Sequence, residues 1–422
     1  MAKSPASARQ SAVYLLDEVL SEGRLISDLI AAGKLNRLDP PDRARAQRLA
    51  TDTLRGLDRA DRLISRHVRK PPPLHVRNIL RLATVELALG GEAHGVVHEA
   101  VALTRASHRH GKLGGLVNAV LRKLADGGVA PWNDLRLPRL PDWLRAPLVE
   151  AWGATPVTAM ERAHFAGAPL DISVKSDPAG WAGELGGALL PTGSIRLDAP
   201  GQVSALPGFE TGDWWVQDAA AALPVRVLDP QPEEHILDLC AAPGGKTMQL
   251  AAAGAQVVAL DISGRRMARV SENLARTGLN AETVTGDALN HQGRYDAIML
   301  DAPCSATGTI RRHPDLPHAK DGGDFGQLIA LQAAMLDHAL TLLNPGGRLV
   351  FCTCSLLPDE GECQVEEALQ RHPGLRIGRA ALDRPGIDPA WITEEGGLRL
   401  RPDYWADRGG MDGFYIAQLS LI

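Results

Sequence analysis

The fold is decided by residues 235–246, which read HILDLCAAPGGK. The first five residues form a short apolar run broken only by Asp238, a pattern typical of a buried strand. Two adjacent glycines, Gly244 and Gly245, separate this run from an alanine-rich segment that predicts a helix. A strand, a glycine turn and a helix in this order indicate an α/β sheet in which the turn lets backbone N–H groups approach a ligand closely.

The rest of the C-terminal half repeats this alternation. Further strands are predicted at 256–260, 282–285, 297–300 and 348–352, with helices at 264–277 and 325–343. Residues 216–422 therefore predict a parallel α/β sheet with helices on both faces. Ligands of such sheets bind beyond the carboxyl ends of the strands. The polar and thiol side chains at those ends are Asp238, Asp261, Asp287, Asp301, Cys304 and Cys354.

Two further domains are predicted before residue 216. Residues 1–127 are expected to be all-helical, because apolar residues recur there at steps of three and four. The expected helices include 42–56, 75–89, 95–107 and 113–125. Residues 128–215 are rich in proline and glycine, and we predict a small α+β linker domain with strands at 170–174 and 194–197. The fold class is thus multidomain.

Charge is distributed unevenly along the chain. The net charge is -5, yet residues 1–130 hold 21 Lys and Arg against 13 Asp and Glu, while the remainder holds 24 against 37. A basic module on an acidic body indicates a polyanion-binding domain, or alternatively a charged helical surface without a ligand. The densest basic stretch contains Arg62, Arg66, Arg69 and Lys70, and we place the three arginines on one helical face. A second basic stretch, 311–313, is either a phosphate contact near the site or a solvated loop.

Cysteine usage and hydropathy indicate the compartment. Five cysteines without paired spacing favour a reducing, cytoplasmic setting over a disulfide framework. Asp17 and Glu18 interrupt the stretch in which a secretory signal would need an apolar core. Because no apolar run approaches about 20 residues, we expect no membrane span.

The glycine turn and the acids suggest the cofactor. The spacing fits neither G-x-G-x-x-G nor a P-loop, which argues against a nicotinamide dehydrogenase or an ATPase. Asp261 is placed to accept hydrogen bonds from ribose hydroxyls, and Asp287 from an adenine amino group. Acidic surroundings favour a nucleoside cofactor without phosphates, and the cationic sulfonium of S-adenosylmethionine suits them best. The alternative is that these acids only cap helices.

Two cysteines suggest covalent chemistry. If the fourth and fifth strands are neighbours, about 4.8 Å apart, Cys304 and Cys354 lie close together just past their ends. We interpret them as a nucleophile and a helper thiol. Cys240, Cys352 and Cys363 fit the alternative of buried structural cysteines. The spacing of Cys352 and Cys354 is wrong for zinc, so no metal is expected.

A methyl donor and a thiol nucleophile together point to pyrimidine methylation. Carbon 5 of cytosine becomes nucleophilic when a thiolate adds to carbon 6, and Asp301 is placed to stabilise this adduct at ring nitrogen 3. A base must then remove the proton on carbon 5 so that the thiol can leave. The target must be unstacked, so the substrate is single-stranded or flipped. From the residues alone, either cysteine is a candidate nucleophile.

The motifs resemble those of a known family. Residues 235–250 resemble the cofactor motif of the Sun (Fmu) family of RNA cytosine carbon-5 methyltransferases. Similar motifs of that family are Gln217-Asp218-Ala219-Ala220, Asp301-Ala302-Pro303-Cys304-Ser305, Thr307-Gly308-Thr309, Thr353-Cys354-Ser355 and Gly413-Phe414-Tyr415. In the N-terminal part, residues 97–101 and 117–121 are similar to the helical RNA-binding module of the NusB antitermination factor. The combination resembles the bacterial 16S rRNA cytosine methyltransferases.

The resemblance implies a domain plan and roles. It implies a NusB-like RNA-binding domain over 1–127, a linker domain over 128–215 and a Rossmann-like class I methyltransferase domain over 216–422. It makes Cys354 the nucleophile and Cys304 the helper in product release; DNA cytosine methyltransferases would reverse these roles. The implied partner is 16S rRNA, and the implied state is a monomer. The implied cofactor contacts are Cys240, Ala241, Ala242, Pro243, Gly244, Gly245, Lys246, Asp261, Arg266, Asp287 and Asp301.

Overall fold

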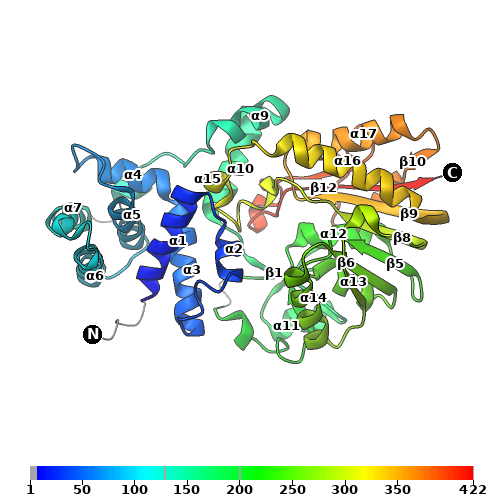
Figure 1. Ribbon diagram of the computed structural model, residues 1–422, viewed down its shortest axis with the longest axis horizontal. Helices are drawn as coiled ribbons and strands as arrows, with labels where there is room; N and C mark the ends of the chain where they lie inside the picture. Colours follow the sequence, from blue (N-terminus) through cyan, green and yellow to red (C-terminus); the bar gives the residue numbers. More distant parts are fainter. Residues whose placement is uncertain (1–6, 128–129, 199–200, 422) are drawn as a thin grey trace. The chain divides into compact units, whose positions relative to one another are not determined.

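The computed structural model describes residues 7–127, 130–198 and 201–421, and its contacts divide the chain into two compact units (Figure 1). The helical unit comprises residues 1–149, 154–167 and 310–321. The sheet unit comprises residues 150–153, 168–309 and 322–422. The division of the sequence into domains ending at residues 127 and 215 stays a prediction.

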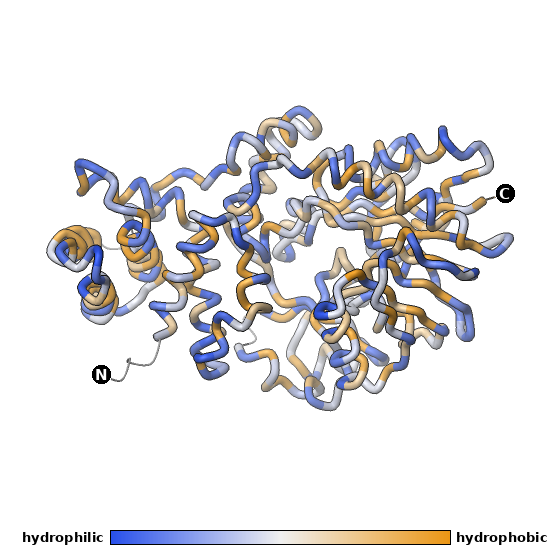
Figure 2. Tube along the Cα trace, viewed as in Figure 1, coloured by the Kyte–Doolittle hydropathy of each residue, from blue (hydrophilic) through white to orange (hydrophobic). Residues whose placement is uncertain are grey.

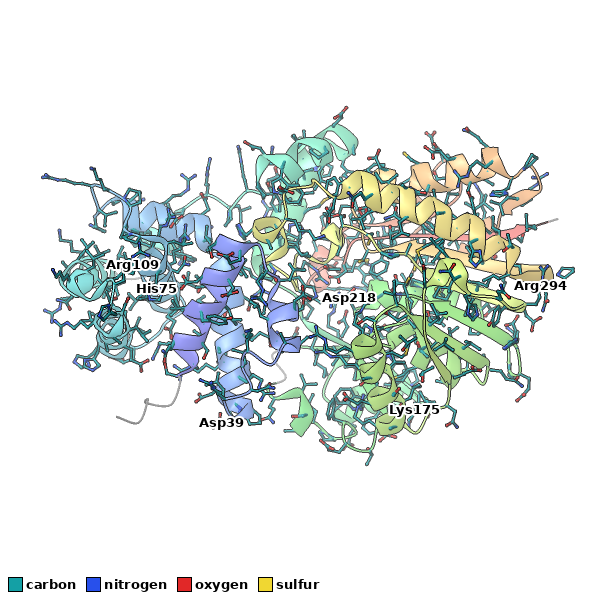
Figure 3. All side chains as sticks on the ribbon, in the orientation of Figure 1. Asp39, His75, Arg109, Lys175, Asp218 and Arg294 are labelled. Atoms are coloured by element: carbon teal, nitrogen blue, oxygen red, sulfur yellow. The ribbon has the colours of Figure 1, made fainter. Side chains whose placement is uncertain are left out.

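Amphipathic helices that share one apolar core build the helical unit. Helix α3 begins at Pro40 because the side chain of Asp39 caps it by accepting from the Asp42 backbone N–H (Figure 3). The four helices named from the sequence are confirmed within two residues. Helix α2 was not predicted, and α4 was expected only as a helix that carries Arg62, Arg66 and Arg69. The helices are α1 (Ala8–Glu22), α2 (Ile26–Ala31), α3 (Pro40–Arg55), α4 (Leu57–Ser65), α5 (Leu74–Ala88), α6 (Ala93–Ala106), α7 (Gly114–Asp126), α8 (Ala130–Asn133), α9 (Asp142–Trp152, ending in the sheet unit), α10 (Ala154–Ala166) and α15 (Leu316–Ala319).

A small antiparallel sheet with strand order β2-β3-β1-β4 opens the sheet unit. Its strands are β1 (Leu170–Val174), β2 (Ala188–Leu189), β3 (Ile195–Leu197) and β4 (Trp214–Val216), and α11 (Pro178–Glu184) packs on it. A buried ion pair joins Asp171 of β1 to Arg196 of β3 at 2.7 Å. Asp171 also accepts from the Ala219 backbone N–H, so this pair ties the small sheet to the helix that follows.

The main sheet has the order β10-β12-β9-β8-β5-β6-β7, with β11 paired to β12. Strands β5 to β9 are mutually parallel, as predicted, but β12 runs antiparallel to β9, β10 and β11. The expectation of a wholly parallel sheet is therefore wrong, because the last strand returns beside β9 in the opposite direction. The strands are β5 (His235–Leu239), β6 (Gln256–Asp261), β7 (Glu282–Thr285), β8 (Tyr295–Asp301), β9 (Leu343–Thr353), β10 (Leu375–Ile377), β11 (Leu398–Leu400) and β12 (Phe414–Leu421).

Helices cover both faces of this sheet (Figure 1). Alternate residues of each strand point to opposite faces, so Leu237 and Leu239 pack with α16 and α17 while Ile236 packs with α12 and α13. The central strands consequently carry much of the hydrophobic colour of this unit in Figure 2. The helices are α12 (Ala219–Leu228), α13 (Gly245–Ala252), α14 (Gly264–Thr277), α16 (Phe325–Thr341) and α17 (Glu362–Arg371).

Within the part of the chain that the structure describes, no helix combines the length and apolar character needed to cross a membrane.

Candidate active site

Cys304 and Cys354 meet at the carboxyl edge of the main sheet. Strands β8 and β9 are parallel neighbours, with Asp301 opposite Cys352. Each catalytic candidate follows the end of one of these strands, and the two sulfur atoms lie 3.4 Å apart. The predicted proximity of the two thiols is confirmed.

The surroundings of the thiols set their protonation. The contact with Cys354, reinforced by burial, raises the pKa of Cys304 well above its usual value. Cys304 is therefore a neutral thiol near pH 7. Burial likewise raises the pKa of Cys352, which is packed inside the sheet with its Sγ 3.5 Å from Asp301 Oδ1. Cys352 is thus a structural thiol, as expected, whereas Cys240 and Cys363 are only partly buried.

A cavity of about 450 Å³ lies beside the thiols, at the ends of β5, β6 and β8. This volume is within the range of small-molecule sites. Both thiols and three of the strand-end acids line the cavity, so the structure brings most of the predicted site together. The lining residues are Cys240, Ala242, Leu260, Asp261, Ile262, Arg266, Asp287, Ala288, Asp301, Ala302, Pro303, Cys304, Ala306, Leu331, Met335 and Cys354.

The glycine turn lies beside this cavity and contributes only Cys240 and Ala242 to its lining. Gly244 has a φ of 101°, which an L side chain rarely adopts, and it starts α13. The Ala242 N–H donates to Asp261 Oδ2 at 3.3 Å, and Arg266 Nη2 donates to the Ala242 carbonyl at 2.8 Å. Burial raises the pKa of Cys240 to about 12, so this lining thiol is also neutral. Five residues of the predicted cofactor set do not line the cavity, namely Ala241, Pro243, Gly244, Gly245 and Lys246.

Lys246 does not line the cavity, but it contacts Asp301, which does. Its Nζ lies 2.8 Å from Asp301 Oδ2, and its side chain is only 9% exposed. Burial alone would lower the pKa of Lys246, but the Asp301 carboxylate outweighs it and raises that pKa. Behind this pair, Asp238 is fully buried and accepts from Thr247 Oγ1 at 2.6 Å. The cation of Lys246 therefore stands directly beside the acid that faces the thiols.

The acids at the strand ends also act as caps. Asp287 Oδ1 accepts from the Leu289 N–H at 3.0 Å and Oδ2 from Asn290 Nδ2 at 3.1 Å, at the start of a single 3₁₀ turn. Asp261 Oδ1 accepts from the Ser263 N–H at 3.0 Å. The same acids cap turns and line the cavity, so a capping role and a cofactor-binding role are compatible.

Sequence reasoning missed the apolar part of the cavity. Leu331 and Met335 come from α16, and the side chain of Ile262, which follows β6, is 72% exposed. An exposed isoleucine next to a strand-end acid was a usable signal. The α16 residues gave none, because the pattern of a helix does not say which strand end it reaches.

The basic stretches differ from their predictions. Arg311 is fully buried in the helical unit, and its carbonyl accepts from Arg55 Nη2 at 2.8 Å. It is neither a phosphate contact nor part of a solvated loop, although Arg312 is exposed. Helix α4 ends at Ser65, so Arg69 does not share a helical face with Arg62, and that prediction is wrong.

The sheet order, the glycine turn and the paired thiols define a Rossmann-like methyltransferase fold. A family model described as 16S rRNA methyltransferase RsmB/F matches residues 225–420, and one described as NusB family matches residues 6–126. A crystal structure of a methyltransferase homolog protein from Pyrococcus horikoshii has a TM-score of 0.54 and 28% sequence identity, covering 66% of this chain and 94% of that one.

Whole-chain relatives give the family. Ribosomal RNA small subunit methyltransferase B of Salmonella arizonae is 33% identical over 442 residues, covering 99% of each chain. The protein of the same name from Erwinia tasmaniensis is 34% identical over 445 residues, again covering 99% of each. The chain therefore belongs to the RsmB/F family of 16S rRNA methyltransferases, joined to an N-terminal domain of the NusB family.

Proposed function

We propose that this protein transfers a methyl group from S-adenosylmethionine to carbon 5 of a cytosine in 16S rRNA, through a bond between Cys354 and carbon 6. The observation that carries the proposal is the pair of sulfur atoms 3.4 Å apart on the wall of one acidic cavity. The names of the Salmonella and Erwinia relatives support ribosomal RNA of the small subunit as the substrate. We expect a cytoplasmic monomer whose NusB-family domain contacts the RNA.

The cavity residues fit the cofactor. Asp261 and Asp287 both line the cavity, which supports the proposal that they accept hydrogen bonds from ribose hydroxyls and from an adenine amino group, and the exposed Ile262 offers an apolar surface for the base. The acidic lining suits the cationic sulfonium, which supplies the methyl group. The other steps of the proposed reaction are carried out by side chains of this protein.

The proposed reaction starts when the Cys354 thiol passes its proton to Asp301 and its sulfur forms a bond to carbon 6. The electrons of the carbon 5–carbon 6 double bond become nucleophilic at carbon 5, which takes the methyl group. In this proposal Asp301, which lines the cavity and pairs with Lys246, shares that proton with ring nitrogen 3 and so stabilises the adduct. Loss of the proton from carbon 5 then expels the Cys354 sulfur and restores the ring.

We assign the removal of that proton to Cys304, whose own proton must first pass to solvent. The hydrogen bond with Cys354 is the largest cause of the raised pKa of Cys304, ahead of burial and of the Cys354 charge. Once Cys354 is bonded to carbon 6, this hydrogen bond and this charge are gone. Burial still raises the pKa of Cys304 in the adduct, so the loss of the Cys354 contact only eases its ionisation. The assignment of attack to Cys354 and release to Cys304 rests on the resemblance of their two motifs to those of the Sun (Fmu) family.

The test uses labelled cofactor with unmodified 16S rRNA or with DNA. Cys354→Ala should transfer no methyl group, whereas Cys304→Ala should accumulate a covalent protein–RNA adduct. Cys363→Ala, a partly buried thiol on α17, is the matched control and should behave as wild type. A dead Cys304→Ala variant without an adduct would reverse the two roles, and methylation of DNA but not RNA would reject the substrate.

A further inference from the structure

A buried polar cluster lies directly behind the two thiols. We call it the Glu360 latch and define it as Ser305, Gln332, Thr353, Ser355 and Glu360. Each member is no more than 1% exposed. Glu360 closes the 3₁₀ turn Pro358–Glu360, shortly after Cys354. Its contacts reach the chain on both sides of the site.

The latch holds the residues that flank Cys304. Glu360 Oε1 accepts from the Ser305 backbone N–H at 2.9 Å, and Oε2 accepts from Ser305 Oγ at 2.5 Å. Gln332 Nε2 donates to the Pro303 carbonyl at 2.9 Å and to Glu360 Oε1 at 3.0 Å. The residues before and after Cys304 are therefore both fastened to one carboxylate, directly or through Gln332.

The latch also holds the residues that flank Cys354. Thr353 Oγ1 donates to the Glu360 carbonyl at 2.8 Å, and Ser355 Oγ lies 3.2 Å from Ser305 Oγ. Glu360 thus contacts a neighbour of each thiol. The Glu360 side chain holds the Cys304 side and its backbone carbonyl holds the Cys354 side, so a side-chain substitution at this position tests the hold on the Cys304 loop.

Burying a carboxylate whose hydrogen-bond donors are all uncharged lowers the free energy of unfolding relative to an apolar side chain at the same position. The donors to Glu360 are a backbone amide, a hydroxyl and a side-chain amide. An apolar side chain would fill the space without this cost, but it would leave the Ser305 and Gln332 donors without their acceptor. After the Cys354 contact and burial, the Glu360 charge also contributes to the raised pKa of Cys304.

We propose that Glu360 is a positioning residue that holds the Cys304 loop against Cys354 and so sets the distance between the two reacting sulfur atoms. The catalytic part of this inference rests on the proposed function. The geometric part does not, because the proximity of two thiols is measurable without RNA or cofactor.

The first readout is oxidation of the full-length protein by hydrogen peroxide. The two thiols give up two protons and two electrons, the sulfur–sulfur bond forms, and peroxide is reduced to water. Mass spectrometry measures the rate at which Cys304 and Cys354 become linked. Disulfide geometry is narrow, so Glu360→Ala should slow this rate about tenfold. Glu360→Gln keeps an acceptor for Ser305 and should stay within about threefold of wild type.

The second readout is methyl transfer. Glu360→Ala should lower kcat about 100-fold with little change in the KM for cofactor, because misplacement of a reacting group affects the chemical step. Glu360→Gln should restore most of kcat. Glu234→Ala is the control; Glu234 pairs with Arg348 beside the opposite end of β5 and should leave both rates unchanged.

The outcomes separate the two proposals. If folded Glu360→Ala is oxidised at the wild-type rate, the positioning role of Glu360 is overturned, whatever the rate of methyl transfer. If Glu360→Ala does not fold, Ser305→Ala removes a smaller part of the cluster, and an unchanged oxidation rate in that variant would also overturn it. If the wild type methylates no RNA while Glu360→Ala slows oxidation, the proposed function fails and the positioning role stands.

Discussion

Aspartates at neighbouring strand ends differ in their hydrogen-bond and ion-pair partners. Asp301 faces the Lys246 ammonium at 2.8 Å, and Asp261 accepts from two backbone N–H groups. Asp238 has the Thr247 hydroxyl as donor to one oxygen, while its other oxygen has no partner within the described part of the chain. Burial accordingly raises the pKa of Asp238 to about 7. The sequence presents all three as equivalent acids after apolar runs.

The raised pKa of Asp238 makes stability depend on pH. An unfolded aspartate loses its proton near pH 4, so between about pH 4 and pH 7 the unfolded state is ionised while the folded state holds the proton. Wild-type stability contributed by this group therefore falls as pH rises through that window. Asp238→Asn should escape the loss, gaining up to about 4 kcal/mol at pH 8 relative to its effect at pH 4. Urea unfolding at both pH values measures this difference; an equal effect at both would contradict it.

The charge of Asp261 should matter for cofactor affinity. Asp261→Asn preserves the shape of the side chain but removes the charge from a carboxylate that lines the cavity. We expect the Kd for S-adenosylmethionine to rise about tenfold, the usual scale for one charged hydrogen bond. Calorimetric titration measures it. The control is Asp296→Asn, near the amino end of β8, where Asp296 accepts from the His235 N–H; a similar loss there would mean that the effect is not local.

At the scale of elements, local sequence patterns predict the bounds of strands and helices better than they predict which strands pair. The runs at β5, β6 and β7 and the helix α14 end within one residue of their predicted bounds because each carries its own periodicity and turn residues. The antiparallel return of β12 beside β9 was missed, because nothing in either strand specifies its neighbour. Glu360 was missed for the same reason: its partners are 28 and 55 residues away. The thiol pair was found because adjacent parallel strands bring their ends to one edge.

Two segments far apart in sequence approach so closely near the site that a methyl group does not fit. A Cβ on Gly308 would lie 2.0 Å from the Gly413 carbonyl oxygen, and the Gly413 N–H donates to the Gly308 carbonyl at 2.8 Å. Gly308→Ala should therefore destabilise the protein by about 1–3 kcal/mol and lower the urea midpoint. Gly326→Ala, in the first turn of α16 with open space around it, should be neutral or stabilising. Equal destabilisation by both would refute the steric explanation.

At the scale of the whole chain, the segment Ile310–Asp321 belongs to the helical unit although the residues on either side of it belong to the sheet unit. Asp315 Oδ2 accepts from the Ile26 N–H, at the start of α2, at 2.7 Å. Trp143 of α9 donates to the Pro317 carbonyl at 3.3 Å. Contacts that span 289 and 174 residues leave no mark in local sequence, so the sequence did not predict that this stretch joins the helical unit. The helical unit thus includes the chain that follows the Cys304 motif.

Because these two segments contact each other, we predict that the Asp315 side chain slows hydrogen exchange in both of them. Asp315 is 3% exposed, and its carboxylate is the acceptor for the first N–H of α2. Asp315→Ala should leave that buried N–H unsatisfied, at a cost of about 1–3 kcal/mol. Hydrogen exchange should then speed up both in Ile26–Ala31 and in residues 310–321, because each segment loses the contact that orders the other. Ser27→Ala, at an exposed position of the same helix, removes a side-chain hydroxyl and should leave exchange in 310–321 unchanged. Faster exchange confined to α2 in Asp315→Ala would show that the later segment is held by its other contacts, such as the bond from Arg55 to the Arg311 carbonyl.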